Sequence, residues 1–170
     1  MTLEGKTALV TGGASGIGKA TVMELARNGA RVICADVNEA AGRALQEEAA
    51  KTNFAVDFVH VDLASSDSIR RCAADVLSRH SRIDVLVNAA GWNDIQSFVD
   101  NQPDYIDRVV DINLGGTLHL THALLPAMIA AEEAAAAAQI KLHEKRAKRY
   151  SWFAPFAHRW LPTTPFDTLV

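Results

Sequence analysis

Four short apolar runs alternate with segments of helical periodicity over the first 128 residues, and this alternation limits the fold more than any other feature. The runs are rich in Val, Ile and Leu, and they read TALVTG (7–12), ARVICAD (30–36), AVDFVHVD (55–62) and IDVLVNAAG (83–91). Such near-continuous apolar runs are typical of strands buried on both faces of a parallel sheet. Strands that alternate with helices predict right-handed crossovers, and therefore an α/β, Rossmann-like, doubly wound parallel sheet.

The segments between the runs carry helix signals of their own. Ser65 or Ser66 can cap a helix, Gly29 suits the left-handed position after one, and Pro103 suits the first turn of a fourth. One buried helix face is predicted by the stripe Ile69, Cys72, Ala73, Val76 and Leu77. The fourth helix would carry Ile106, Val109, Val110, Leu114 and Leu118.

Charge and aromatic residues divide the chain into two parts. The net charge of −3 gives no reason to expect nucleic acid as a partner. Residues 1–140 hold 11 Lys and Arg against 18 Asp and Glu, whereas residues 141–170 hold 6 against 2. We therefore expect a dinucleotide-binding domain over 1–130 and a separate tail over 131–170. The basic run at 141–149 is interpreted as a solvated helix face, with an acidic partner as the alternative.

Cysteine usage and hydropathy indicate the compartment. Cys34 and Cys72 fall in apolar patterns, which predicts small buried side chains in a reducing compartment and no disulfide. No basic-then-apolar leader opens the chain, so a cytoplasmic location is expected. Polar residues interrupt the most apolar region, 118–140, and we expect no membrane span there. His119 and His122 lack a third ligand, so packing or surface positions are favoured over a metal site.

A glycine-rich loop, TGGASGIG (11–18), follows the first run directly and opens the first helix. At such a junction Gly12 would form the turn, Gly16 would allow close approach of a diphosphate, and Gly18 would let helix and strand pack closely. The Ser15 hydroxyl can add a hydrogen bond to a phosphate. Any tight strand–helix turn favours glycine, but the strand before and the helix after are the context that a dinucleotide site requires.

Two aspartates end the second and third runs. Asp36 lies 18 positions after Gly18, where a carboxylate can accept hydrogen bonds from the adenosine ribose. It would repel a ribose 2′-phosphate, and positions 35–38 hold no Arg or Lys, so NAD is favoured over NADP. The alternative is a solvated turn aspartate. Asp62 could approach the adenine amino group, or it could cap the following turn.

These motifs together resemble the short-chain dehydrogenases/reductases. The resemblance covers residues 1–128 and also includes VDL at 61–63, NAAG at 88–91 and INLGG at 112–116. It implies a cofactor site lined by Gly12, Ser15, Gly16, Ile17, Gly18, Asp36, Asp62, Leu63, Asn88, Ala89 and Gly91. In that family the residue matching Asn88 mainly steadies the sheet. Asn113 matches the family's helix asparagine, which positions a water in the proton relay, and it is poor helix material.

The family's acid–base pair, a tyrosine and a lysine four residues later, is missing from this sequence. Val109 stands four positions after Tyr105, and Ala154 four positions after Tyr150. No β-branched run follows Met128, so we expect a sheet truncated after the fourth strand, in the order 3-2-1-4. A helical tail would follow, and then an irregular segment rich in proline and aromatic residues.

Two functional hypotheses follow from these observations. The first is an NAD(H)-binding, short-chain dehydrogenase-like protein whose family reaction transfers hydride between NAD and a secondary alcohol or ketone, with catalysis impaired by the missing pair. The second is a non-catalytic dinucleotide-binding or protein-interaction module from a truncated or fused gene. Without a fifth strand, the apolar edge of the fourth strand needs a cover, and either the tail could lie across it or a second chain could pair there. In the second case a homo-oligomer through the exposed sheet edge or the fourth helix is expected.

Overall fold

The computed structural model describes residues 2–94 and 97–150, with side chains as far as Lys141. The chain divides into two compact units, Met1–Ala131 and Glu132–Val170. The sheet and the helices that cover it lie in the first unit. The predicted irregular segment, with Pro155, Pro162 and Pro165, lies outside the described residues.

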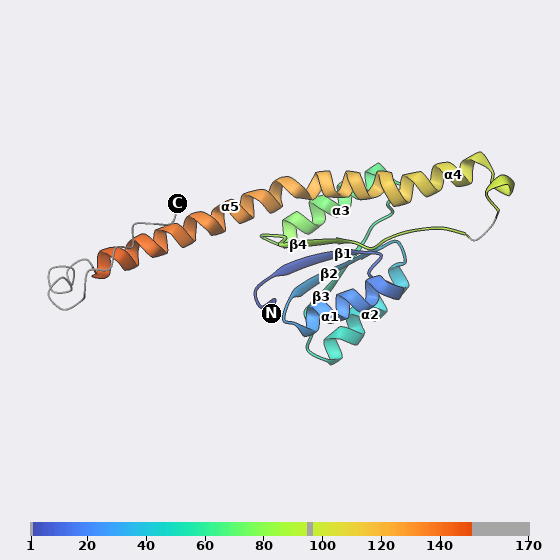
Figure 1. Ribbon diagram of the computed structural model, residues 1–170. Helices are drawn as coiled ribbons and strands as arrows, with labels where there is room; N and C mark the ends of the chain where they lie inside the picture. Colours follow the sequence, from blue (N-terminus) through green and yellow to red (C-terminus); the bar gives the residue numbers. More distant parts are fainter. Residues whose placement is uncertain (1, 95–96, 151–170) are drawn as a thin grey trace, which may run out of the picture. The chain divides into compact units, whose positions relative to one another are not determined.

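Four parallel strands form one sheet (Figure 1). They are β1 (Thr7–Thr11), β2 (Arg31–Asp36), β3 (Val56–His60) and β4 (Val85–Asn88), in the order β3-β2-β1-β4. The α/β class, the strand order and the edge position of the third strand are confirmed. Thr11 pairs with Ala35 on one side and with Asn88 on the other, so the carboxyl ends of the three strands meet at one edge of the sheet.

Helices cover both faces of this sheet (Figure 1). The helical elements of the described residues are α1 (Gly16–Arg27), α2 (Glu39–Lys51), α3 (Ser66–Arg79), the 3-10 turn η1 (Phe98–Asp100), α4 (Pro103–Val110), the π-helical turn η2 (Asp111–Gly116) and α5 (Thr117–Tyr150). Of these, α1 and α2 cover one face of the sheet, and α3 and the first turns of α5 cover the other. Leu9 of β1 packs with Val76 of α3 and Leu120 of α5, whereas Val10 packs with Val22 of α1 and Leu45 of α2. Both faces of β1 are therefore buried, which explains why apolar residues follow one another without alternation from Ala8 to Val10.

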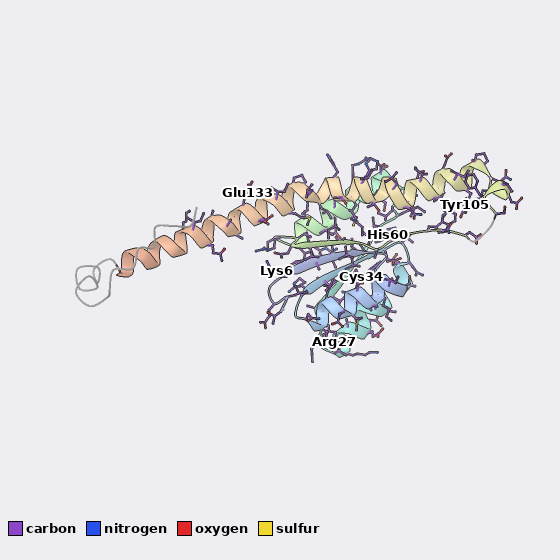
Figure 2. All side chains as sticks on the ribbon, in the orientation of Figure 1. Lys6, Arg27, Cys34, His60, Tyr105 and Glu133 are labelled. Atoms are coloured by element: carbon purple, nitrogen blue, oxygen red, sulfur yellow. The ribbon has the colours of Figure 1, made fainter. Side chains whose placement is uncertain are left out.

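Several local predictions are confirmed. Ser65 caps α3, because its side chain accepts a hydrogen bond from the Ser68 N–H at 3.3 Å. Gly29 takes a φ of +92°, and Pro103 opens α4. Cys34 (Figure 2) and Cys72 are buried free thiols, and burial raises their pKa values to about 12 and about 11. Both stay protonated and unreactive at neutral pH.

Two predictions about element bounds need correction. The third and fourth runs are longer than the strands that they form. In β3 pairing ends where His60 meets Asp36, so 61–62 have no partner in β2. In β4 pairing ends where Asn88 meets Thr11, so 89–91 have none in β1. The fourth helix is interrupted by the π-helical turn after Val110. The apolar stripe predicted on it is largely exposed, and the buried anchors are Leu120 and Leu124 instead.

By length and composition alone, the helical stretch 103–141 could cross a membrane, and only 6% of its most apolar window is buried. Leu120 and Leu124, within this stretch, are fully buried in the core cluster that covers one face of the sheet. This part of the helix therefore packs on the sheet.

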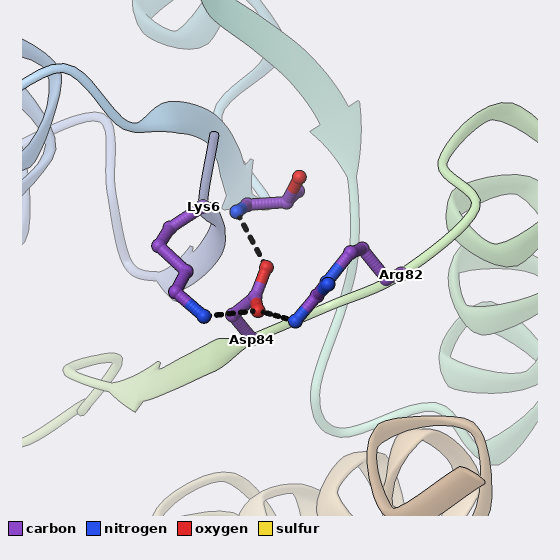
Figure 3. A network of polar contacts seen from close by, with 4 residues as sticks. Lys6, Arg82 and Asp84 are labelled. Carbon is purple, nitrogen blue, oxygen red and sulfur yellow. Dashed lines mark hydrogen bonds and ion pairs between the residues drawn. The ribbon is translucent and has the colours of Figure 1, made fainter. Parts of the chain in front are cut away.

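A buried carboxylate ties the start of β1 to the segment that leads into β4 (Figure 3). The side chain of Asp84 is 6% exposed, and it accepts hydrogen bonds from the Thr7 N–H at 2.9 Å, from Lys6 Nζ at 3.1 Å and from Arg82. Burial would raise the pKa of Asp84, but the hydrogen bonds from Thr7, Lys6 and Arg82 outweigh burial and hold the pKa below its ordinary value. The charged form is thus favoured in the folded protein.

Asp84→Asn is expected to lower the free energy of unfolding by about 2 kcal/mol at neutral pH, because the buried neutral side chain pairs less well with the Thr7 N–H and the partly exposed Arg82 and Lys6. Because the pKa of Asp84 is lower in the folded protein, its carboxylate stabilises the fold at pH values above 3.8, the unfolded pKa. This contribution is lost as the pH falls through the folded pKa. The two proteins should therefore converge in strong acid. Urea unfolding across this range measures the effect, and Asp75→Asn, in an exposed pair with Arg79, is the control. If Asp75→Asn lowered the free energy of unfolding as much as Asp84→Asn, the burial of Asp84 would not be the cause of the effect.

Candidate functional site

A cavity of about 370 Å³ lies at the carboxyl ends of the strands. In this sheet the crossovers reverse direction between β1 and β4, which is the switch point where α/β sheets bind ligands. Six residues of the predicted cofactor site line the cavity: Gly12, Ser15, Asp36, Asp62, Leu63 and Gly91. The other five predicted residues do not line the cavity, although each is close in sequence to a residue that does. They are Gly16, Ile17, Gly18, Asn88 and Ala89.

The glycine loop is shaped by two close backbone contacts. Gly12 has a φ of +63°, and a Cβ there would lie 2.7 Å from Ala90 Cα. A Cβ on Gly18 would lie 2.0 Å from the Gly12 carbonyl oxygen. Gly16 has a φ of +50° and open space around it, and the Ser15 side chain makes no capping hydrogen bond. The N-terminus of α1 therefore offers unpaired N–H groups and a hydroxyl to an anion.

Asp36 holds this loop against the end of β2. Its Oδ2 accepts a hydrogen bond from the Ala14 N–H at 2.9 Å, and its Oδ1 accepts one from the Asn38 N–H at 2.9 Å. The residue is only 9% exposed, so it is not a solvated turn aspartate. Because a carboxylate has about four acceptor positions, it can still accept hydrogen bonds from ligand hydroxyls.

The remaining predicted residues have structural contacts of their own. Asp62 Oδ1 accepts a hydrogen bond from the Ala64 N–H at 2.9 Å, so this residue caps the turn after β3 while it also lines the cavity. Asn88 Nδ2 donates to Thr121 Oγ1 at 3.3 Å and so connects β4 to α5. Leu63 is buried and packs against Gly116.

Thr11 is a site residue that the sequence reasoning missed. Its hydroxyl oxygen accepts hydrogen bonds from the N–H groups of Ala89 and Ala90, both at 3.1 Å. Thr11 is 1% exposed, and its hydroxyl fixes the loop after β4 at the rim of the cavity. The only signal in the sequence was a polar residue that ends the strand directly before the glycine loop.

Asn113 clamps the same loop from the helical side. Its Oδ1 accepts a hydrogen bond from the Trp92 N–H at 2.7 Å, and its Nδ2 donates to the Trp92 carbonyl at 2.9 Å. Its side chain is thus engaged in holding backbone, and its catalytic role stays a prediction. The Trp92 ring packs on the Tyr105 ring at 5.1 Å between centroids, and the Arg108 guanidinium lies 4.5 Å from the Trp92 centroid.

Comparison with known proteins agrees with this geometry. The sequence profile of the short chain dehydrogenase family matches residues 6–140, and the chain belongs to this family. It is 43% identical to the sorbitol dehydrogenase of Cereibacter sphaeroides over 130 residues, which are 76% of this chain and 50% of that enzyme. It is 38% identical to the 3-oxoacyl-(acyl-carrier-protein) reductase FabG of Thermotoga maritima over 129 residues, which are 76% and 52% of the two chains.

A solved metagenomic short-chain oxidoreductase in complex with NADP superposes on the chain with a TM-score of 0.73 and 36% identity. The superposition covers 77% of this chain and 60% of that one. The chain spans about half the length of the two sequence relatives. Within the described residues, no group of three or more His, Cys, Asp or Glu side chains could hold a metal ion.

Proposed function

We propose that the chain binds NAD in the cavity at the carboxyl ends of the strands. The observation that carries this proposal is Asp36, a buried carboxylate held beside the glycine loop and lining the same cavity. A carboxylate there can accept hydrogen bonds from both ribose hydroxyls and repels a 2′-phosphate. The metagenomic relative binds NADP, so the choice between the two cofactors is the point that the experiment must decide.

The proposed reaction is hydride transfer between NAD and a small secondary alcohol or ketone. The names of the two sequence relatives support it, since a sorbitol dehydrogenase oxidises an alcohol and a 3-oxoacyl reductase reduces a ketone group. These 170 residues contain no Tyr-x-x-x-Lys motif, so this chain by itself would lack the proton transfer on which the reaction depends and turn over slowly.

We also propose a cytoplasmic location and a homo-oligomeric state for the protein. A cytoplasmic location is supported by Cys34 and Cys72, which are free thiols in the core. A homo-oligomer through the sheet edge or α4 is supported by two observations. Among the described residues β4 pairs only with β1, and Ile106 and Val110 of α4 are exposed.

Calorimetric titration of the 170-residue chain with NADH and NADPH tests the cofactor. NADH should bind at least tenfold more tightly, and Asp36→Ala should weaken NADH binding at least tenfold, because charge-assisted hydrogen bonds to the ribose are lost. Asp36→Ala should also narrow the difference in affinity between NADH and NADPH. Asp36→Asn, which keeps the side-chain volume, serves if the alanine variant is unfolded.

Asp75→Ala, which removes an exposed carboxylate from α3, is the matched control and should leave both affinities unchanged. Tighter binding of NADPH than of NADH by the unchanged chain would overturn the choice of cofactor. Failure to bind either dinucleotide would overturn the proposed function itself.

A further inference from the structure

The charges that line the cavity are unevenly matched to a dinucleotide. Asp36 and Asp62 contribute two carboxylates, and a dinucleotide brings a negatively charged diphosphate into the same space. The glycine loop offers N–H groups but no full positive charge. Arg108 is the only basic side chain among the described residues that line the cavity.

Arg108 reaches the cavity from α4 and is held there by an aromatic face. It stands one helical turn before Ile112, which lines the same cavity. Its guanidinium lies 4.5 Å from the centroid of the Trp92 ring, a cation–π arrangement. The Trp92 backbone is in turn fixed by two hydrogen bonds to Asn113. Within the part of the chain that the structure describes, no carboxylate lies within ion-pair distance of Arg108.

We propose that Arg108 is a cofactor-binding residue that supplies the positive charge for the diphosphate of the bound dinucleotide, with Trp92 as its platform. The inference rests on the proposed dinucleotide binding and adds a cation on α4 to the glycine loop. A guanidinium is weakly hydrated and always charged, so it can stay stacked on the indole and still attract phosphate. The Tyr105 ring packs against Trp92 and steadies the platform (Figure 2 labels Tyr105 on α4).

The charge of Arg108 can be tested through the salt dependence of NADH binding. At an ionic strength of about 50 mM, Arg108→Gln should weaken NADH binding about three- to tenfold, and this difference should shrink at about 500 mM because salt screens the attraction. Arg108→Lys keeps the charge but loses the planar stack on Trp92, so its affinity for NADH should lie between those of the unchanged chain and Arg108→Gln. Calorimetry on the full 170-residue chain measures all three.

Two controls separate charge from packing. Arg27→Gln makes the same charge change in the last turn of α1, whereas the cavity lies at the first turn, and it should leave NADH affinity nearly unchanged. Adenosine, which has no phosphate, should bind the unchanged chain and Arg108→Gln equally well. Equal weakening of adenosine and NADH would show a loss of packing and overturn the assignment.

The outcomes also distinguish this inference from the proposed function. If the unchanged chain binds NADH and Arg108→Gln binds it with the same affinity and salt dependence, Arg108 has no role and NAD binding stands. If the unchanged chain fails to bind NADH, the proposed function fails, and the role of Arg108 fails with it.

Discussion

Gly18→Ala is expected to lower the free energy of unfolding by about 3 kcal/mol, because the added methyl group has no room. A Cβ at this position would lie 2.0 Å from the Gly12 carbonyl oxygen and 2.7 Å from its carbonyl carbon. Gly12 cannot move away freely, since it already lies against the backbone of Ala90. Any relief must separate the start of α1 from the end of β1, so NADH binding should be lost as well.

Gly16→Ala is the matched control for this prediction. Its Cβ would meet nothing within 4 Å, so the cost should be only the conformational strain at a φ of +50°, about 1 kcal/mol. Urea unfolding at constant m-value gives both differences. If the two substitutions were equally costly, steric contact with Gly12 would not be the reason for glycine at position 18.

The strands and their order could be predicted from the sequence because burial on both faces leaves a direct mark on composition. Leu9 and Val10 point to opposite faces of β1 and are both fully buried, so the run cannot alternate with polar residues. The glycine loop could be placed for a similar reason, since its position depends only on the strand before it and the helix after it.

The contacts across the site could not be predicted in the same way. Asp36 was expected to face a ligand, and the sequence gives no sign that it also holds the Ala14 N–H. The Trp92–Arg108 contact joins residues on a loop and a helix whose relative position depends on the whole sheet. Periodicity also overestimated burial on α4, because it shows which side chains share a helix face but not which face meets the core.

The tail shows a different limit of sequence reasoning. High helix propensity predicts a helical tail over residues 132–150, and these residues belong to α5. Propensity needs no partner, so it can be read locally. The catalytic chemistry would require a tyrosine and a lysine one helical turn apart. Whether such a pair is present depends only on residue identity, and the 170 residues contain none.

The second large effect is expected at Gly116, the last residue of the π-helical turn. Gly116 is buried, and a Cβ there would lie 2.5 Å from both Leu63 Cβ and the Leu63 carbonyl oxygen. Gly116→Ala should therefore push α5 away from the turn after β3 and destabilise the protein by about 3 kcal/mol. Since Leu63 lines the cavity, NADH affinity should fall in the same variant.

Gly115→Ala makes the same chemical change one residue earlier and is expected to be neutral or to stabilise the protein by up to about 1 kcal/mol, through better helix propensity. The nearest atom to its Cβ would be the Val110 carbonyl oxygen at 3.7 Å, an ordinary van der Waals contact. Thermal and urea unfolding of the pair provide the measurement. Opposite effects at adjacent positions would show that the approach of the helix to Leu63 requires glycine at position 116, whereas equal effects would assign the requirement to the π-helical backbone itself.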